Sequence, residues 1–398
     1  MNANSSAQWR DPGMPGSSII PRTDWDYPPY HRWTFQHVRE MTATARIWRG
    51  QGPTLPLPTR TVEIDHIEFD VAGRRRTIRD FLDNSFTDGF LVLSRGEIVA
   101  ERYMNGMKPH GHHLAMSVTK SIVATVLGIL VHKGLVETAA PVTKYLPELE
   151  ATAYRGATVQ QVLDMTSGVL FDESYTTEGS HMQQLDQACG WKPMMRPEWP
   201  QTVWQLIMTL TEQQRPHGQV FNYRSIETDI LGFLMERVSG LPLAELISNE
   251  LWAPMGAEED AYITVDHGGY ALADGGLNAT LRDYARFALL HLRGGTLNGR
   301  RIVPSAWIEE TRRGNHKLFQ GVYRTVLPNG AYHNQFWIED PERRSYMCRG
   351  IFGQYIYMDP QTDFAAVKLS TWPEFVNPDR SIEALAAIHA IRDVCAET

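Results

Sequence analysis

The order of apolar and polar residues predicts β-strands near both ends of the 398-residue chain. A β-rich run from Phe90 to Ser94 is followed by Arg95-Gly96 and by a second β-rich run that ends at Tyr103. Two such runs around a two-residue turn predict a hairpin. Three further β-rich runs lie towards the carboxyl end, at Phe336 to Ile338, Gln354 to Met358 and Phe364 to Ser370.

Helical patterns lie between these strands and at the end of the chain. From Ser121 to Lys133 the apolar residues leave no wide polar face, and Gly134 stands where a helix commonly ends, so we expect a buried helix. The stretch from Val159 to Leu251 alternates helical periods with long polar loops. Apolar residues recur about every three positions from Ile382 to Ile391, which predicts an amphipathic terminal helix.

Strands at both ends with helices between them predict an α+β fold, in which one antiparallel sheet is built from both chain ends, flanked by helices, with a mainly helical region inserted. We expect an N-terminal arm and connecting segment over residues 1–60, an α/β region with the antiparallel sheet over residues 61–120 and 265–398, and a mainly helical region over residues 121–264. The Asn, Ser, Gly and Pro of Met1 to Pro21 are typical of a surface arm, and the prolines of Gly50 to Arg60 are typical of a connection.

Composition and charge narrow the possible partners and compartments. The formal net charge of -8 argues against a nucleic-acid partner. The longest apolar run, Ile122 to Val131, is about half of what a membrane-spanning helix needs, and the amino terminus lacks a secretory pattern. The cysteines, Cys189, Cys348 and Cys395, are odd in number and widely spaced, which argues against a disulfide framework or a zinc ribbon. We therefore expect a soluble cytoplasmic protein without a membrane partner.

Ser117 and Lys120 are the first candidates for catalytic residues. They open the predicted buried helix three residues apart, and this spacing places both side chains on one helix face. A lysine can activate a serine hydroxyl if burial lowers the pKa of its amine, and the helix start can stabilise the negative charge on an attacked carbonyl. Such a pair also arises by chance. However, Lys120 is the only lysine with a serine three residues before it, and an apolar helix tolerates an idle ammonium group poorly.

Tyr223 is a second candidate because it precedes the largely apolar helix predicted from Ile226 to Val238. Held near a protonated lysine, its phenol would lose its proton more easily and could shuttle it from Ser117 to a leaving group. The alternative is an ordinary packing tyrosine.

Other motifs of catalysis are absent from the sequence. His110, His112 and His113 lack a metal-ligand spacing such as His-Glu-x-x-His, so we interpret them as a turn or surface cluster. There is no Gly-x-Ser-x-Gly elbow and no Gly-rich phosphate loop. We therefore expect neither a metal nor a cofactor.

The motifs Ser117-x-x-Lys120 and Tyr223-x-Ser225 resemble the signatures of class C β-lactamases, DD-peptidases and family VIII carboxylesterases. The resemblance extends over about residues 90–370 and implies a serine β-lactamase-like fold. It also implies a two-step mechanism in which Ser117 forms an acyl-enzyme and both Lys120 and Tyr223 serve each step. The third signature of the family, Lys-Thr-Gly or His-x-Gly, has no direct counterpart, and Arg349 to Gly353 is the matching stretch. The backbone N–H groups of Ser117 and Ile351 would then form the oxyanion hole.

Within this family the chain is similar to the 6-aminohexanoate-oligomer hydrolases. The similar segments are His113 to Ser121, Ile263 to Asp266, Gly353 to Pro360 and Val367 to Pro373. This resemblance implies a small ester or linear amide as substrate, substrate-binding roles for Tyr175, Asp186 and Ser225, and a homodimer. A packing tyrosine and a solvated acid are the alternatives for Tyr175 and Asp186. The alternative functions are a β-lactamase or DD-peptidase, for which the missing lysine is unfavourable, and a non-catalytic sensor or assembly module.

Overall fold

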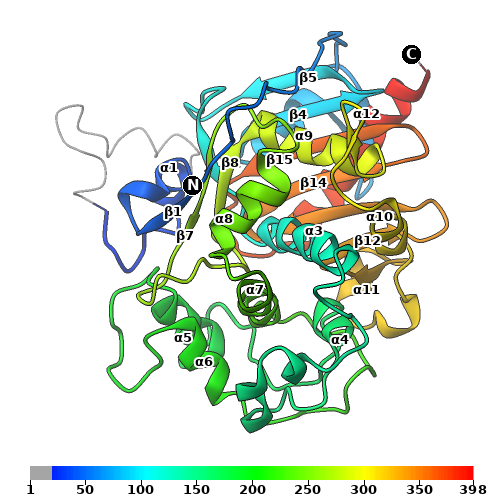
Figure 1. Ribbon diagram of the computed structural model, residues 1–398. Coiled ribbons are helices and arrows are strands. Elements are labelled where there is room, and N and C mark those ends of the chain that lie inside the picture. The colour runs from blue at the N-terminus through cyan, green and yellow to red at the C-terminus, as the bar shows by residue number, and fades with distance from the viewer. Residues whose placement is uncertain (1–19, 398) are drawn as a thin grey trace.

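The computed structural model describes residues 20–397, and its centre is an antiparallel sheet of seven strands in the order β11-β12-β13-β14-β15-β4-β5 (Figure 1). The pairing of β15 with β4 joins the carboxyl-terminal strands to the amino-terminal hairpin, which confirms the sheet predicted from both chain ends. The strands are β4 (Thr87–Ser94), β5 (Glu97–Tyr103), β11 (Ala331–His333), β12 (Phe336–Asp340), β13 (Ser345–Gly350), β14 (Gln354–Asp359) and β15 (Phe364–Ser370).

The predicted hairpin is confirmed as β4 and β5. Ser94 lies opposite Glu97, and the turn residues Arg95 and Gly96 have φ angles of 54° and 85°. Positive φ at both central residues fits the twist of paired strands. The other three predicted runs lie in β12, β14 and β15, but the sequence patterns did not predict β13. Its sequence, SYMCRG, contains no β-branched residue and only one aromatic residue, and its first four residues are all buried, so it lacks the alternation of a half-exposed strand.

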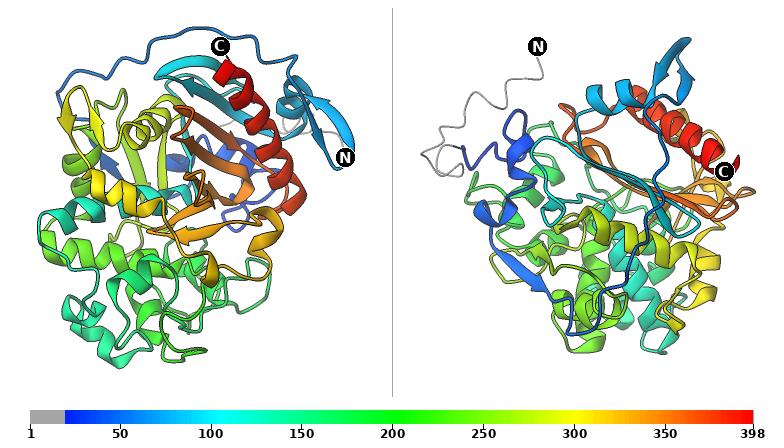
Figure 2. Two further views of the ribbon diagram at one scale, coloured as in Figure 1. Left: turned by 90° about the vertical axis from the view of Figure 1, so that its right-hand side faces the viewer. Right: turned by 90° about the horizontal axis from the view of Figure 1, so that it is seen from above.

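Alternation along the strands divides the core into two layers, one on each face of the sheet. In β4, Leu91 and Leu93 belong to the core that α9 (Leu281–Leu292) also lines, whereas Phe90 and Val92 belong to the core lined by α12 (Pro378–Glu397). Successive side chains of a strand point to opposite faces, so one strand supplies both layers. Figure 2 shows α12, the predicted terminal helix, lying along one face of the sheet.

The buried helix predicted after Ser117 is α3 (Val118–His132). Its side chains are buried from Val118 to Leu130, and Gly134, with a φ angle of 74°, lies just beyond its end. The region between α3 and the next sheet strand is mainly helical and forms the lower part of the molecule in Figure 1. Its helices are α4 (Val159–Leu163), α5 (His181–Ala188), α6 (Val203–Thr209), α7 (Ile226–Ser239) and α8 (Leu243–Ile247).

Several of the described residues before position 48 are packed against the rest of the protein, whereas most of residues 48–60 are exposed or half-buried. Trp25, Phe35 and Met41 are buried, and β1 (Thr44–Ile47) belongs to a second sheet with the order β1-β7-β8-β6. The arm expected over Met1 to Pro21 lies almost entirely outside the described residues, and the division of the chain into regions remains a prediction. The other strands of this sheet are β6 (His112–Leu114), β7 (Ala261–Thr264) and β8 (Leu277–Thr280).

Shorter elements complete the fold. They are α1 (His31–Thr34), α2 (Ile78–Asn84), α10 (Ser305–Thr311), α11 (Tyr323–Val326), β2 (Glu68–Val71), β3 (Arg74–Thr77), β9 (Thr296–Leu297), β10 (Arg300–Arg301), the 3-10 turns η3 (Val38–Glu40), η4 (Val142–Lys144), η5 (Pro147–Ala151), η7 (His316–Leu318) and η8 (Ile351–Gly353), and the π-helix η6 (Ser248–Trp252). Within residues 20–397, no helix combines the length and the apolar character that crossing a bilayer requires.

Candidate active site

Ser117 and Lys120 are in direct contact at the start of α3. Lys120 Nζ donates a hydrogen bond of 2.8 Å to Ser117 Oγ, and Lys120 is only 1% exposed. Ser117 is half-buried and lines a cavity of about 680 Å³, so its hydroxyl is reachable from outside. The contact expected from the spacing of these two residues is therefore present.

The backbone around Ser117 is held in a tight conformation. Met116, directly before it, has a φ angle of 50°, a left-handed conformation that costs free energy in a residue with a side chain. The end of β13 passes close by, because a Cβ atom added to Gly350 would lie 2.6 Å from the carbonyl oxygen of Ala115. A glycine at this position therefore lets Ile351 and Ser117 line the same cavity. This placement is compatible with the predicted pair of oxyanion-hole N–H groups, whose role remains a prediction.

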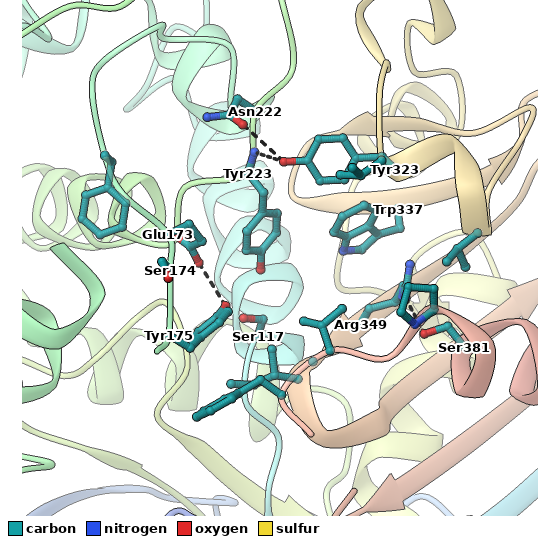
Figure 3. Close-up of a pocket in the computed structure, with 18 of the residues that line it drawn as sticks. Ser117, Glu173, Ser174, Tyr175, Asn222, Tyr223, Tyr323, Trp337, Arg349 and Ser381 are labelled. Atoms are coloured by element: carbon teal, nitrogen blue, oxygen red, sulfur yellow. Dashed lines mark hydrogen bonds between the residues drawn. The ribbon is translucent and has the colours of Figure 1, made fainter. Parts of the chain in front are cut away.

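Tyr223 completes the group around the nucleophile. Its hydroxyl is hydrogen-bonded with the side chains of Ser117 and Lys120, and Figure 3 shows it pointing towards Ser117. Lys120 Nζ lies 5.3 Å from the centre of the Tyr223 ring, whose other neighbours include the stacked ring of Trp337. The structure therefore brings together the three residues predicted to be catalytic. Burial nevertheless raises the pKa of Tyr223 more than the charge of Lys120 lowers it, so the expectation that this phenol loses its proton more easily is wrong.

The electrostatic environment of Lys120 differs from the one we expected from the sequence. Burial by itself would lower the pKa of Lys120, but the pKa is raised because nearby groups carry negative charge when ionised. These groups are Tyr223, Asp274, Glu173 and Asp229. Lys120 Nζ also donates to the carbonyl oxygen of Asp274 at 2.5 Å and lies 3.8 Å from its carboxylate. The expectation of a lowered pKa is thus wrong, and the ammonium form is favoured.

Sequence reasoning missed the three carboxyl groups of this cluster. Burial raises the pKa of Glu173, Asp229 and Asp274, because each carboxylate loses contact with water. Asp229 accepts from Ala273 N at 2.9 Å and belongs to α7. The sequence offered one sign of this cluster, namely that Asp229 lies within a largely apolar helix. Acidic residues are rarely fully buried without a partner, so this position indicates a functional or paired carboxyl group.

Ser225 and Tyr175, predicted to bind substrate, both contact Glu173. Ser225 donates to Glu173 through its hydroxyl at 2.6 Å and through its backbone N–H at 2.8 Å. Ser225 is buried behind the cavity, so its position differs from that of a residue contacting substrate. Tyr175 lines the cavity and donates to Glu173 at 3.1 Å (Figure 3). Its ring stacks on that of Phe375.

Asp186, the third predicted substrate-binding residue, does not line this cavity. It lies near Asp26 and Lys192, which are ion-paired with each other. Burial and the charge of Asp26 raise the pKa of Asp186 to about 8, and Lys192 only partly offsets this. Asp186 therefore lies outside the cavity that Ser117 lines, and its role in binding a substrate ammonium remains a prediction.

The expected turn or surface cluster of histidines is only partly present, because His110 is exposed and His112 half-buried whereas His113 is buried. His113 is buried and its Nε2 lies 3.0 Å from the Asp88 carboxylate, while His112 Nε2 lies 2.6 Å from the carbonyl oxygen of Asp260. The three cysteines all belong to the described part of the chain, where they are buried and free of disulfides, as predicted.

Comparisons with known proteins agree with this geometry. The beta-lactamase family profile matches residues 74–390. A curated 6-aminohexanoate-dimer hydrolase from Paenarthrobacter ureafaciens is 37% identical over 381 residues, which cover 94% of each chain. Esterase EstB from Burkholderia gladioli is 23% identical over 222 residues, about half of each chain.

Solved structures give the same result. A Bacillus anthracis protein, provisionally described as a 6-aminohexanoate-dimer hydrolase, superimposes with a TM-score of 0.87 at 27% identity, over 96% of this chain and 98% of its own. A family VIII carboxylesterase has a TM-score of 0.58 at 18% identity, over 78% of this chain and 96% of its own, and supports the fold alone. Because the family profile spans most of the chain and a 37%-identical relative spans nearly all of it, the chain belongs to the beta-lactamase family of serine hydrolases.

Proposed function

We propose that this protein hydrolyses small esters and linear amides, of the 6-aminohexanoate-oligomer type, through an acyl-enzyme on Ser117. The observation that carries the proposal is the 2.8 Å contact between Lys120 Nζ and Ser117 Oγ at the surface of a cavity, with the Tyr223 hydroxyl hydrogen-bonded to both side chains. A nucleophile and a proton acceptor within hydrogen-bond reach are what acyl transfer requires.

The raised pKa of Lys120 decides how the proton moves in this proposal. Burial raises the pKa of Tyr223 and the Lys120 ammonium offsets this only in part, so the phenolate is a minor form of the free protein. In this proposal the oxygen of that form accepts the Ser117 proton while Oγ attacks the substrate carbonyl. The negative charge that forms on the carbonyl oxygen is stabilised by the N–H groups of Ser117 and Ile351. When the bond to the leaving group breaks, Tyr223 returns the proton to the leaving oxygen or nitrogen.

Hydrolysis of the acyl-enzyme uses the same groups in the opposite direction. Tyr223 accepts a proton from water, the resulting hydroxide attacks the ester carbonyl, and the proton returns to Ser117 Oγ as the acid is released. The net reaction adds one water molecule to the substrate and yields a carboxylic acid and an alcohol or amine. Each group is regenerated, so no cofactor is needed in this scheme.

The substrate class in this proposal comes from the relatives and from the site. The 37%-identical relative is a 6-aminohexanoate-dimer hydrolase, and the cavity is lined by both polar and apolar groups, including Tyr175, Trp337 and Val376. A β-lactamase or DD-peptidase is the second candidate, but the stretch beside Ser117 lacks the lysine that these enzymes use for the substrate carboxylate. A homodimer and a cytoplasmic location remain predictions from the resemblance and the composition.

The proposal is tested by covalent labelling and by turnover. We expect a fluorophosphonate probe to modify Ser117, located by peptide mass spectrometry, and Ser117→Ala to remain unlabelled. We also expect turnover of p-nitrophenyl butyrate and of the linear 6-aminohexanoate dimer. A folded protein that is not labelled at Ser117 would instead indicate a sensor or assembly module, and rapid turnover of nitrocefin with none of the dimer would indicate a β-lactamase.

A further inference from the structure

Tyr323, in α11, contacts the backbone of one of the proposed catalytic residues. Its hydroxyl accepts a hydrogen bond of 3.0 Å from the Tyr223 backbone N–H and donates one of 3.3 Å to Asn222 Oδ1 (Figure 3). Burial raises the pKa of Tyr323, so the hydroxyl keeps its proton at neutral pH. A protonated phenol both donates and accepts, so this single oxygen holds two neighbours at once.

The residues on either side of Tyr223 are held from the mainly helical part of the chain. The Asn222 backbone N–H donates to the Met165 carbonyl oxygen at 3.0 Å, and the buried Arg224 guanidinium donates to the Asn222 carbonyl oxygen at 2.9 Å. These contacts fix Asn222 and Arg224, whereas the Tyr323 hydroxyl accepts the N–H of Tyr223 itself. The position of the Tyr223 backbone therefore depends on α11 as well as on its own neighbours in the chain.

An aromatic cluster holds the Tyr323 ring in place. The centre of this ring lies 4.7 Å from that of Phe221, 5.7 Å from that of Phe319 and 6.0 Å from that of Trp337. Trp337 also stacks on Tyr223, with 5.5 Å between the ring centres. Two side chains that contact each other thus hold Tyr223, Tyr323 at its backbone and Trp337 at its ring.

The proposed role of Tyr223 requires an exact position of its phenol oxygen. This hydroxyl is hydrogen-bonded with the side chains of Ser117 and Lys120. Proton transfer needs heavy atoms within hydrogen-bond reach, and a displacement of about 1 Å can cost about 100-fold in rate. Because the tyrosine ring is rigid, a shift of the Tyr223 backbone also moves the phenol oxygen relative to Ser117.

The alternative role for Tyr323 is a contact with substrate, because it lines the same cavity as Ser117 and Tyr223. Such a contact would act through the ring and would appear in KM. A hydrogen bond to the Tyr223 backbone acts through the hydroxyl and would appear in kcat. Removal of the hydroxyl alone therefore separates the two roles.

We propose that Tyr323 is a positioning residue, whose hydroxyl fixes the Tyr223 backbone and so keeps the Tyr223 phenol within hydrogen-bond reach of Ser117. This inference rests on the proposed function, because it takes Tyr223 as the group that accepts and returns the proton. The short helix α11 thereby contributes to proton transfer without contacting the reacting atoms.

The test replaces Tyr323 by phenylalanine, which keeps the ring. We expect Tyr323→Phe to lower kcat for p-nitrophenyl butyrate by about 10- to 100-fold and to change KM by less than about 3-fold. Tyr145→Phe is the matched control and should keep the native kcat. The Tyr145 hydroxyl also accepts a backbone N–H, that of Glu137 at 2.7 Å, but Tyr145 does not line this cavity. An unchanged kcat in Tyr323→Phe, or a loss confined to KM, would overturn the inference.

A double variant distinguishes positioning of Tyr223 from a general effect on the fold. Once Tyr223→Phe has removed the phenol hydroxyl, Tyr323→Phe should lower kcat by less than about 2-fold further, because the group that it positions no longer takes part. A second loss as large as the first would show that Tyr323 acts independently of Tyr223 and would contradict the proposal.

Amide hydrogen exchange separates this inference from the proposed function, because it needs no turnover. We expect the Tyr223 backbone N–H to exchange at least about 10-fold faster in Tyr323→Phe than in the native protein, measured by mass spectrometry with fragmentation that resolves single amides. Faster exchange supports the positioning of Tyr223 even in a protein whose Ser117 is not labelled by a fluorophosphonate. Equal exchange overturns it, even if Ser117 is labelled and esters are cleaved.

Discussion

The effect of burial on the pKa of an ionisable side chain can be measured at Lys368. It belongs to β15, is fully buried, and donates to the Ser85 carbonyl oxygen at 3.2 Å and to the Ser370 hydroxyl. Burial lowers its pKa from 10.5 to about 7, although the charge of Asp88 opposes this shift. We predict that Lys368→Met changes the pH dependence of the free energy of unfolding.

The sign and size of the effect follow from proton linkage. In the folded protein the amine loses its proton near pH 7, whereas in the unfolded chain it does so near pH 10.5. Folding therefore releases a proton between these values, and the native protein gains stability as the pH rises through this window. One pH unit corresponds to about 1.4 kcal/mol, so the full difference is about 5 kcal/mol and about 2 kcal/mol of it is recovered between pH 7 and 9.

The assay is urea unfolding of the native protein and of Lys368→Met at pH 7 and pH 9. Methionine does not titrate, so the stability of the variant relative to the native protein should fall by about 2 kcal/mol from pH 7 to pH 9. The lost hydrogen bonds to Ser85 and Ser370 shift both values equally and cancel in this comparison. Lys108→Met, at an exposed lysine, is the control and should show no such change. An equal difference at both pH values would refute the reasoning about Lys368.

Three further predictions concern the catalytic group. Lys120→Ala should lower kcat/KM by at least about 10³-fold, nearly as much as Ser117→Ala, because the two act as a unit; a variant with most of its activity for p-nitrophenyl butyrate would refute the role of Lys120. Tyr223→Phe should lower kcat by about 10²- to 10⁴-fold in the same assay while the fold, followed by circular dichroism, is retained. Gly350→Ala should lower kcat by about 10²- to 10³-fold, because a Cβ 2.6 Å from the Ala115 carbonyl forces β13 and the Ile351 N–H away from Ser117. Gly52→Ala, where a Cβ meets no atom within 4 Å, should be without effect.

Local patterns were sufficient to predict much of the fold. The hairpin at Arg95-Gly96 and the helix that ends before Gly134 depend on turn residues and periodicity that lie within a few positions of each other. The strand β13 depends instead on its neighbours β12 and β14, so its own sequence carried little signal. Trp25 and Phe35 are also buried against segments that are distant in the sequence. The packed conformation of residues 20–47 could therefore not be predicted from local patterns.

The same distinction applies to the site. Ser117 and Lys120 could be paired from the sequence because helix geometry alone brings residues three positions apart together. The charge of Lys120 could not be predicted, because it depends on Glu173, Asp229 and Asp274, which come from a loop, from α7 and from the segment before β8. Spacing therefore predicts which side chains meet, whereas the protonation state depends on every charge that the fold adds.

The acidic groups around Lys120 change the roles that can be proposed for Lys120 and Tyr223. If burial alone acted, Lys120 would be a neutral amine and the direct base for Ser117. With acidic groups around it the ammonium form is favoured. This ammonium offsets only part of the burial that raises the pKa of Tyr223, so the phenolate proposed as the proton acceptor is a minor form of the free protein. The proposed roles of lysine and tyrosine in proton transfer thus depend on the buried acids. An isosteric change that removes one of these ionisable groups, such as Glu173→Gln, should therefore act on catalysis through Lys120 and Tyr223.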